Sequence, residues 1–277
     1  MEKNRILKSM FKKKSVIFFS LLILVIVIPI ILAPTIAPND IYAQNIANKF
    51  AEPCAQYPFG TDQLGRCIFS RILYGGRATL GYSFLTVLLS SVIGLAIGIT
   101  SGYVGGRFDG FVMRVCDIMY AFPSMVLTLV FVAIAGRGMN KIVIAMLITQ
   151  WVSTARISRT ITLNEKSHSY ISAARISGSS NIKIMFRHIL PSVFTPMIAL
   201  FTINFGHTIL SVSGLSFLGL GVQPPDPEWG AMIDLGREFI YSHPMIMLWP
   251  GILILLIVIS LNVVGDYLQD SLQELKS

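Results

Sequence analysis

The feature that most constrains this chain is a run of uncharged, mostly apolar residues from Ser15 to Ala33. A helix of this length, rising about 1.5 Å per residue, crosses the roughly 30 Å hydrocarbon core of a bilayer. Similar apolar segments recur near residues 79–103, 115–135, 141–157, 195–220 and 246–266. The sequence therefore predicts an all-α integral membrane protein with six transmembrane helices.

The composition excludes most soluble classes. Apolar residues make up 53% of the 277 residues and charged residues 13%, about half the charged fraction of a soluble domain. A net charge of +8 could indicate a nucleic-acid-binding face, but the Lys and Arg residues lie in short groups between the apolar segments. We therefore expect membrane lipid, and no nucleic acid, among the partners.

The positive charges predict the orientation, because short cytoplasmic segments are enriched in Lys and Arg. With the amino terminus inside, 15 of the 22 basic residues fall in cytoplasmic segments and 7 in outer ones. We expect a multi-pass protein of the cytoplasmic membrane with both termini cytoplasmic. A cleaved signal peptide is the alternative for the first segment, but its apolar region would span only about 7 to 15 residues, so we expect an uncleaved anchor.

This topology divides the chain into parts. They are a cytoplasmic amino terminus (1–14), the first transmembrane helix (15–36), an extracytoplasmic segment (37–78) and a five-helix core (79–277). The core contains a cytoplasmic loop (156–194) and an extracytoplasmic loop (222–245).

Small residues predict a close helix contact in the second apolar segment. Gly94, Gly98 and Gly102 are spaced by four and share one helix face. Such stripes let two helix backbones approach in a bilayer. We expect this face to pack against another helix, although glycines also occur without such a role in membrane helices.

Polar residues inside the predicted helices mark a candidate path. Carboxylates, typical of ion-coupled carriers, are absent from the helix centres, since Asp117 and Asp266 lie near helix ends. Asn204 and His207 lie well inside a segment and are candidates for a translocation path. His207 is suited either to a substrate or metal or to a hydrogen bond between helices, and no metal site is assigned.

The cysteines leave one question open. Cys54 and Cys67 share the outer segment, where they pair in an oxidising compartment or remain thiols. We expect Cys116, near a cytoplasmic helix end, to be inert.

The loop 156–194 is too polar to cross a membrane and predicts two short helices around a break. Gly178 is expected to end the first helix, Asn181 to cap the second, and Pro191 to mark the return to the membrane. One small helix face suits docking into a groove of a partner protein; its residues are Tyr170, Ala173, Ala174 and Ser177. An ordinary basic cytoplasmic loop is the alternative.

This loop resembles the EAA loop of permease subunits in ATP-binding-cassette importers. The resemblance is carried by Ala173-Ala174, by Gly178 and by Leu190-Pro191, with Ser172 in place of the usual acidic residue. It implies a coupling helix that seats on the ATPase, without the salt bridge of that acid. The coupling residues would be Ser172, Ala173, Ala174, Gly178, Leu190 and Pro191.

Two further segments narrow the resemblance. Residues 59–71 resemble the GTDxxGRDxxSR segment of dipeptide, oligopeptide and nickel permeases, with Cys67 in place of an Asp. Residues 214–230, together with 262–266, are similar to the second permease subunit of that family. His207 after Gly206 is more similar to the nickel-type members.

The resemblance implies partners and leaves this chain without catalytic residues. The chain has no G-x-x-x-x-G-K-[ST] phosphate loop, so ATP and Mg are expected on two partner ATPase subunits and no cofactor on this chain. A second homologous permease and an extracytoplasmic substrate-binding protein would complete the importer. Its cargo would be a nickel chelate or a small peptide, nickel being slightly favoured, and an ATP-independent channel or secondary carrier is the alternative.

The outer segments would form the mouth of the path and contact the binding protein. The candidate contacts are Asp62, Arg66, Asp226, Glu228 and Arg237.

Overall fold

The computed structural model describes residues 13–274, which fold into helices joined by turns and loops. In chain order the elements are α2 (Lys14–Ile31), α3 (Ala33–Ile36), η1 (Ile46–Asn48), α4 (Ile68–Val104), α5 (Gly106–Tyr120), α6 (Ser124–Ala135), α7 (Met139–Lys166), α8 (Ser169–Ile176), α9 (Asn181–Ile184), η2 (Met185–Ile189), α10 (Leu190–Phe217), α11 (Trp229–Gly236), η3 (Arg237–Phe239) and α12 (Met245–Glu274). The predicted all-α class is confirmed. Most of the predicted amino-terminal part, 1–14, and Lys276 lie outside the described residues.

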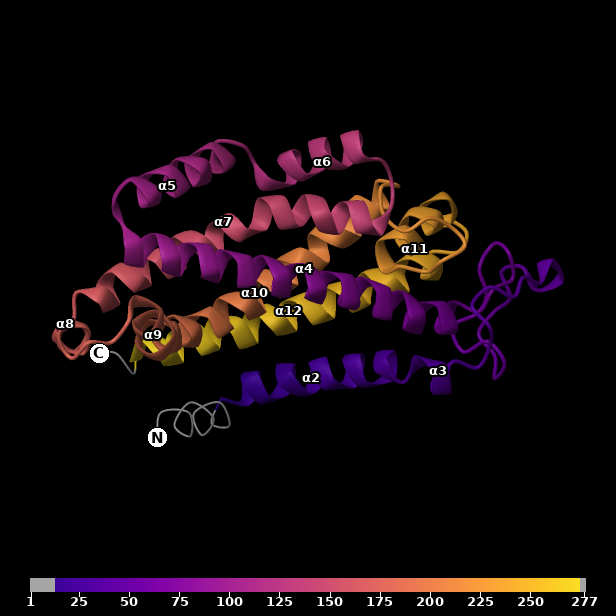
Figure 1. The fold of residues 1–277 in the computed structure, drawn as a ribbon. Coiled ribbons are helices and arrows are strands. Elements are labelled where there is room, and N and C mark those ends of the chain that lie inside the picture. The colour runs from indigo at the N-terminus through magenta and orange to yellow at the C-terminus, as the bar shows by residue number, and fades with distance from the viewer. Residues whose placement is uncertain (1–12, 275–277) are drawn as a thin grey trace.

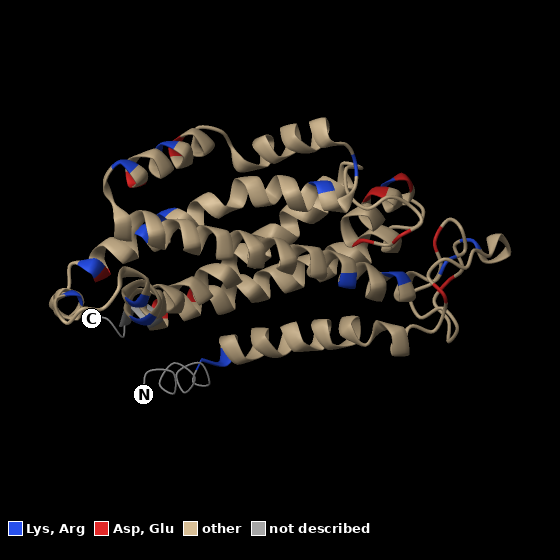
Figure 2. Cartoon of the chain, in the orientation of Figure 1, with Lys and Arg blue, Asp and Glu red and all other residues tan. Residues whose placement is uncertain are grey.

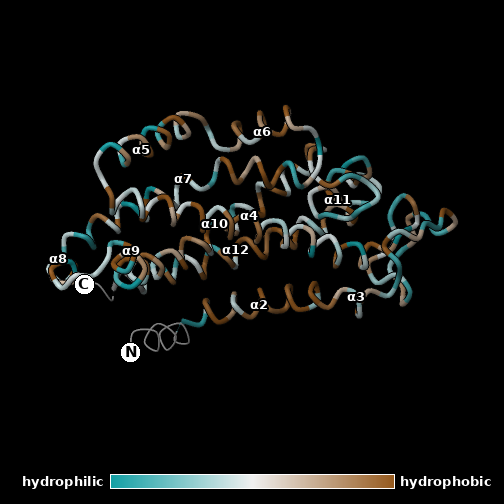
Figure 3. The backbone as a smooth tube through the Cα atoms, in the orientation of Figure 1, coloured by the Kyte–Doolittle hydropathy of each residue, from teal (hydrophilic) through white to brown (hydrophobic). Residues whose placement is uncertain are grey.

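The long helices α2, α4, α7, α10 and α12 lie side by side (Figure 1). They run between two ends: the α8 end, formed by α8 and α9, and the α11 end, formed by α11 and the segment 37–67. Charged residues gather toward these ends and leave the middle of the long helices nearly free of charge (Figure 2). Hydrophobic residues dominate that middle, most clearly in α2 and α12 (Figure 3). This is the distribution expected of helices that cross a bilayer.

Four helical stretches are long and apolar enough to cross a membrane. They are Lys14–Ile31, Ile68–Val104, Asn181–Phe217 and Met245–Ser271. The pair α5 and α6 makes a fifth if a bent pair counts as one span. α7 covers the predicted fourth segment but is more polar than these stretches. Four or five candidate spans are therefore found in residues 13–274, and the six-span topology stays a prediction.

The helix α4 starts earlier than its apolar run. The sequence predicted a start at 79, whereas α4 begins at Ile68. Arg71 is only 2% exposed, and its Nη1 donates to the carbonyl oxygens of Ile41 (2.9 Å) and Pro225 (3.1 Å). Because protein rather than lipid surrounds this polar first turn, the helix continues beyond the residues suited to hydrocarbon.

The glycine stripe of α4 packs against α7. A Cβ on Gly94 would lie 2.6 Å from the Cβ of Thr154, and a Cβ on Gly102 would lie 2.9 Å from the carbonyl oxygen of Arg159. A Cβ on Gly98 would overlap the Oγ of Ser158. The predicted packing role of these glycines is confirmed.

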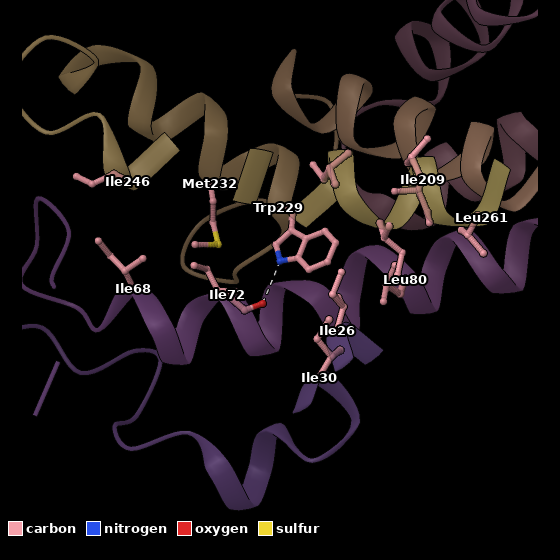
Figure 4. Close-up of a cluster of buried hydrophobic side chains, with 13 residues drawn as sticks. Ile26, Ile30, Ile68, Ile72, Leu80, Ile209, Trp229, Met232, Ile246 and Leu261 are labelled. Atoms are coloured by element: carbon pink, nitrogen blue, oxygen red, sulfur yellow. Dashed lines mark hydrogen bonds between the residues drawn. The ribbon is translucent and has the colours of Figure 1, made fainter. Parts of the chain in front are cut away.

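At the α11 end, a buried tryptophan ties α11 to α4. Trp229 is fully buried, and its Nε1 donates to the carbonyl oxygen of Ile72 at 3.0 Å (Figure 4). The surrounding cluster includes Ile26, Ile30, Ile68, Ile72, Leu80, Ile209, Met232, Ile246 and Leu261. The α11 end is therefore a packed core rather than a loose loop.

Candidate functional site

A cavity of about 530 Å³ lies among α4, α7, α10 and the junction between α5 and α6. Its lining carries nine hydroxyl, amide and imidazole side chains: Ser90, Tyr120, Ser124, Thr149, Gln150, Ser153, Asn204, His207 and Thr208. The structure thus places the two predicted path residues, Asn204 and His207, together in one lining.

The junction between α5 and α6 forms one wall of this cavity. α5 ends at Tyr120, α6 begins at Ser124, and the two helices are bent by 86°. Pro123 lies at the junction and has no N–H to continue the helical ladder. Where the sequence predicted one segment, 115–135, the chain forms two helices. Backbone that leaves a helix at membrane depth is tolerated where it lines a cavity.

The cavity lining combines polar side chains with apolar ones such as Phe122, Leu127 and Val152. Its lining residues include no Asp, Glu, Lys or Arg. Thr208 Oγ1 lies 3.3 Å from Gln150 Oε1 and donates to it, which orients the Gln150 amide. Such groups, with the His207 imidazole, can bind a polar solute through hydrogen bonds. No group of three or more His, Cys, Asp or Glu residues is arranged to hold a metal ion in the described part of the chain.

Several lining residues were not identified from the sequence, chiefly Ser90, Gln150 and Ser153. One signal was present, because Gln150 and Trp151 interrupt the apolar run 141–157. A polar amide in the middle of an apolar helix is expected to face protein or a cavity rather than lipid.

A second candidate site is the elbow, which we define as residues 169–184, comprising α8, the turn after it and α9. Gly178 has a φ of +80°, a left-handed conformation that glycine adopts without strain. Here the sequence was right about the break but wrong about the cap. Ser180, not Asn181, caps α9, since its Oγ accepts from the N–H of Lys183 at 3.3 Å.

The predicted coupling residues lie at or beside the surface of this elbow. Ser172, Ala173 and Gly178 are exposed, Ala174 and Leu190 are half-buried, and Pro191 is exposed in the first turn of α10. Of the predicted small face, Tyr170 and Ser177 are likewise exposed.

Large apolar side chains also project from the elbow and from η2, which follows it. Ile176 is 87% exposed, Ile182 66% and Phe186 67%. Basic residues stand beside them in the sequence: Arg175, Lys183 and Arg187. Exposed apolar groups with a polar rim are typical of a protein contact surface.

Tyr103, at the end of α4, contacts the elbow. Its hydroxyl donates to Asn181 Oδ1 (2.8 Å), and its carbonyl oxygen accepts from Lys166 Nζ (2.6 Å). The guanidinium of Arg175 lies 5.9 Å from its ring centre. One residue of α4 therefore contacts the end of α7 and both helices of the elbow.

Three of the predicted outer contacts are buried. Asp62 is 4%, Arg66 3% and Glu228 0% exposed. Asp62 pairs with Arg66 at 2.7 Å. Glu228 accepts from the Thr79 hydroxyl (2.7 Å) and the Ala231 N–H (2.9 Å). Their charges are satisfied within the chain, so in this structure they hold the outer segments together rather than face a partner.

The other two predicted outer contacts, Asp226 and Arg237, are exposed. Asp226 Oδ1 accepts from the Tyr42 hydroxyl at 2.6 Å, joining the outer loop to the segment 37–67. This hydrogen bond raises the pKa of Tyr42 above its usual value, because ionisation would remove the donated proton. Arg237 pairs with Asp234 at 3.2 Å.

Cys54 and Cys67, predicted for the outer side, are free thiols in this structure, Cys54 exposed and Cys67 buried. Cys116 is also free and is fully buried.

Comparison with known proteins identifies the family. The model of the binding-protein-dependent transport system inner membrane component matches residues 94–275. The nickel transport system permease protein NikC of Escherichia coli K12 is 37% identical over 235 residues, 85% of either chain. The dipeptide transport system permease protein DppC of Alkalihalophilus pseudofirmus is 38% identical over 265 residues, 96% of this chain and 87% of the relative.

A third relative and one solved structure extend the comparison. The glutathione transport system permease protein GsiD of Pectobacterium atrosepticum is 41% identical over 226 residues, 81% of this chain and 75% of the relative. A chain of the inward-facing MetNI methionine ABC transporter shares the fold, with a TM-score of 0.57 and 18% identity over 73% of this chain and 95% of that one. The chain belongs to the binding-protein-dependent transport system inner membrane components and is a permease subunit of an ATP-binding-cassette importer.

Proposed function

We propose that this chain forms half of the translocation path of an ATP-driven, binding-protein-dependent importer. The observation that carries the proposal is the polar cavity at the α5–α6 junction. His207 lines that cavity and is exposed in the isolated chain. An imidazole at membrane depth is costly against lipid, so a second permease of similar build would cover this side and complete the path.

The complete importer would contain this chain, a second homologous permease, two ATPase subunits that bind ATP and Mg, and an extracytoplasmic binding protein. The chain would cross the cytoplasmic membrane six times, with both termini and the elbow cytoplasmic. The α11 end would then face the binding protein, and Asp226 and Arg237 are the predicted contacts that remain exposed there.

The mechanism requires two states of the helices rather than chemistry on this chain. ATP-driven closure of the ATPases would move the elbow, and Tyr103 with Lys166 would pass that movement to α4 and α7. Because the ATPases bind the two states differently, nucleotide shifts their populations and opens the cavity alternately to either side.

The cargo would be a nickel chelate or a small peptide, with selection mainly on the binding protein. Relatives are named for nickel, for a dipeptide and for glutathione, itself a tripeptide. A lining of neutral donors and acceptors suits a peptide or an intact chelate, since a bare transition metal ion is held by several ligating side chains.

The first test is affinity purification of the chain from detergent-solubilised membranes, with identification of the co-purifying subunits. ATP hydrolysis is then measured with binding protein loaded with a nickel–histidine chelate or with dialanine. Recovery of a second permease and ATPases, stimulated by one of these ligands, supports the importer and names its cargo class. Recovery of the chain alone, with solute flux in ATP-free liposomes, would favour a channel or carrier.

Replacing His207 with leucine is expected to weaken transport without preventing assembly. One lost hydrogen bond to a polar solute reduces the apparent affinity by about threefold to tenfold. The measurement is the substrate dependence of uptake into proteoliposomes that contain the whole importer. Thr202→Val is the matched control, because Thr202 lies on α10 and its hydroxyl donates only to Ile198 of the same helix. If both variants show the same substrate dependence of uptake, His207 does not contact the transported solute.

Replacing Ile182 or Phe186 with aspartate is expected to release the ATPase subunits. A buried, unpaired carboxylate at a protein interface costs about 2 kcal/mol or more, so recovery of ATPase with the chain falls by about tenfold or more. The matched control is Ile240→Asp, an exposed isoleucine near the α11 end. If both changes leave ATPase recovery as high as the control does, the elbow and the adjoining η2 are not the docking site.

A further inference from the structure

The helix α5 is amphipathic and rests on α7 by one face. Val112 and Cys116 are buried on that face and form a cluster with Val152 of α7. Phe111 and Ile118 are 68% and 63% exposed. Because only Val112 and Cys116 of α5 are buried, apolar packing holds α5 by a small area, and the polar contacts add to the attachment.

The main polar contact is a two-pronged ion pair between α5 and α7. Arg159 Nε donates to Asp109 Oδ1 at 2.5 Å, and Arg159 Nη2 donates to Asp109 Oδ2 at 2.5 Å. The hydroxyl of Ser101 on α4 donates to the same carboxylate, also at 2.5 Å. The Asp109 side chain is 14% and the Arg159 side chain 27% exposed. Paired donors on a shielded carboxylate give both strength and a fixed geometry.

A second ion pair repeats the contact one helical turn away on α7. Arg156 pairs with Asp117, and its guanidinium lies 4.6 Å from the centre of the Tyr120 ring. The side chains of Arg156 and Asp117 are 39% and 64% exposed. Water screens this pair more strongly, so it contributes less to the attachment than the first one.

These contacts lie between the cavity and the elbow. α7 lines the cavity with Thr149 and Ser153. It ends at Lys166, whose Nζ donates to the carbonyl oxygen of Tyr103 beside the elbow. Asp109 lies in the first turn of α5, and Met119 and Tyr120 at the other end of the helix line the cavity. If α7 moves, these wall residues therefore move with it only when α5 is attached to α7.

We propose that Asp109 and Arg159 form a latch, a positioning pair that makes α5 move with α7, so that the cavity wall follows the elbow. The coupling part of this inference rests on the proposed function; the attachment part does not. In the latched state, Cys116 stays shielded between the two helices. Loss of the latch would let α5 lift from α7 and would leave ATP hydrolysis running without a matched change in the cavity.

Cys116 provides a direct test of the attachment. Membranes that contain the full importer are treated with N-ethylmaleimide, and alkylation of each cysteine is followed by mass spectrometry of its peptide. Cys67, buried near the α11 end, serves as an internal reference. Asp109→Asn and Arg159→Gln are each expected to raise alkylation of Cys116 by about tenfold or more, because hydrogen bonds to a charged group hold the local opening closed. Alkylation of Cys67 should stay unchanged.

A charge swap and a control variant make the test specific. Asp109→Arg with Arg159→Asp should restore protection of Cys116 at least in part, since the pair is reformed with its partners exchanged. Arg107→Gln is the control, because Arg107 is exposed on α5 and makes no ion pair within residues 13–274. The latch is overturned if the single variants stay within about twofold of the wild type. It is also overturned if Cys67 is alkylated in parallel with Cys116, which would indicate general unfolding.

The coupling part has its own readout. In proteoliposomes with loaded binding protein, the single variants should hydrolyse several times more ATP per solute imported, and the charge swap should lower that ratio. An unchanged ratio together with an exposed Cys116 would reject the coupling and leave only the attachment. If the wild-type importer shows no hydrolysis stimulated by binding protein, the proposed function fails, while the alkylation result on the attachment still stands.

Discussion

Replacing Gly98 with leucine is expected to prevent the chain from reaching its folded state. A Cβ at this position would overlap the hydroxyl of Ser158 and the carbonyl oxygen of Ala155 on α7. Overpacking of a core usually costs about 1 to 3 kcal/mol. The cost here should reach or exceed the top of that range, because backbone atoms can move aside only if α4 and α7 separate. The measurement is the fraction of chain that stays monodisperse after detergent extraction, with its midpoint of thermal unfolding.

The control for this prediction is Gly81→Leu on the same helix, where an added Cβ meets no atom within 4 Å. Gly98→Ala should give an intermediate loss, because it adds the clashing Cβ without the rest of the side chain. An extraction yield and unfolding midpoint for Gly98→Leu equal to those of Gly81→Leu would show that α4 and α7 do not pack as closely as described.

The close helix contact of the α4 glycines was predictable from their local spacing, although the partner helix, α7, was not. Three glycines at intervals of four define one helix face whatever the rest of the chain does. The break at Gly178 was predictable for a similar reason, since a left-handed residue between two short helices is usually glycine. Asn204 and His207 were named as candidates because polar side chains inside an apolar segment are rare, and the structure places both in one cavity lining.

The outer residues were harder to place, because their partners lie far away in the sequence. Glu228 was expected at the surface, yet its carboxylate is bound by Thr79 across 149 positions of the chain. The helix α4 was likewise expected to start later, because nothing near Arg71 in the sequence indicates the carbonyl oxygen of Pro225. From the sequence alone, a charged side chain in a predicted outer segment is expected to face solvent unless its buried partner is known.

The cavity shows the same limit. Pro123 was visible in the sequence, but a proline alone does not distinguish a kinked helix from two helices bent by 86°. The bend brings residues 119–124 into the lining beside Gln150 and His207. That juxtaposition depends on the packing of α5 on α7, and therefore on Asp109 and Arg159.

Replacing Trp229 with alanine is expected to destabilise the chain by about 3 to 5 kcal/mol, the usual cost of removing a large buried aromatic side chain. Trp229 is fully buried, and it fills the space that Gly75 and Gly76 leave on α4. The substitution also leaves the carbonyl oxygen of Ile72 without its indole partner (Figure 4). The cavity that remains would loosen α11 from α4.

Two variants separate the contributions of volume and hydrogen bond. Trp229→Phe keeps most of the apolar contact and loses the indole N–H, so it should cost about 1 to 3 kcal/mol, the loss of one buried hydrogen bond and a smaller void. Trp249→Ala is the matched control, because Trp249 is only half-buried and stacks on Phe59 at 4.1 Å. The free energies of unfolding are compared by denaturant titration in detergent. If Trp249→Ala destabilises the chain as much as Trp229→Ala, Trp229 has no special role in holding α11 on α4.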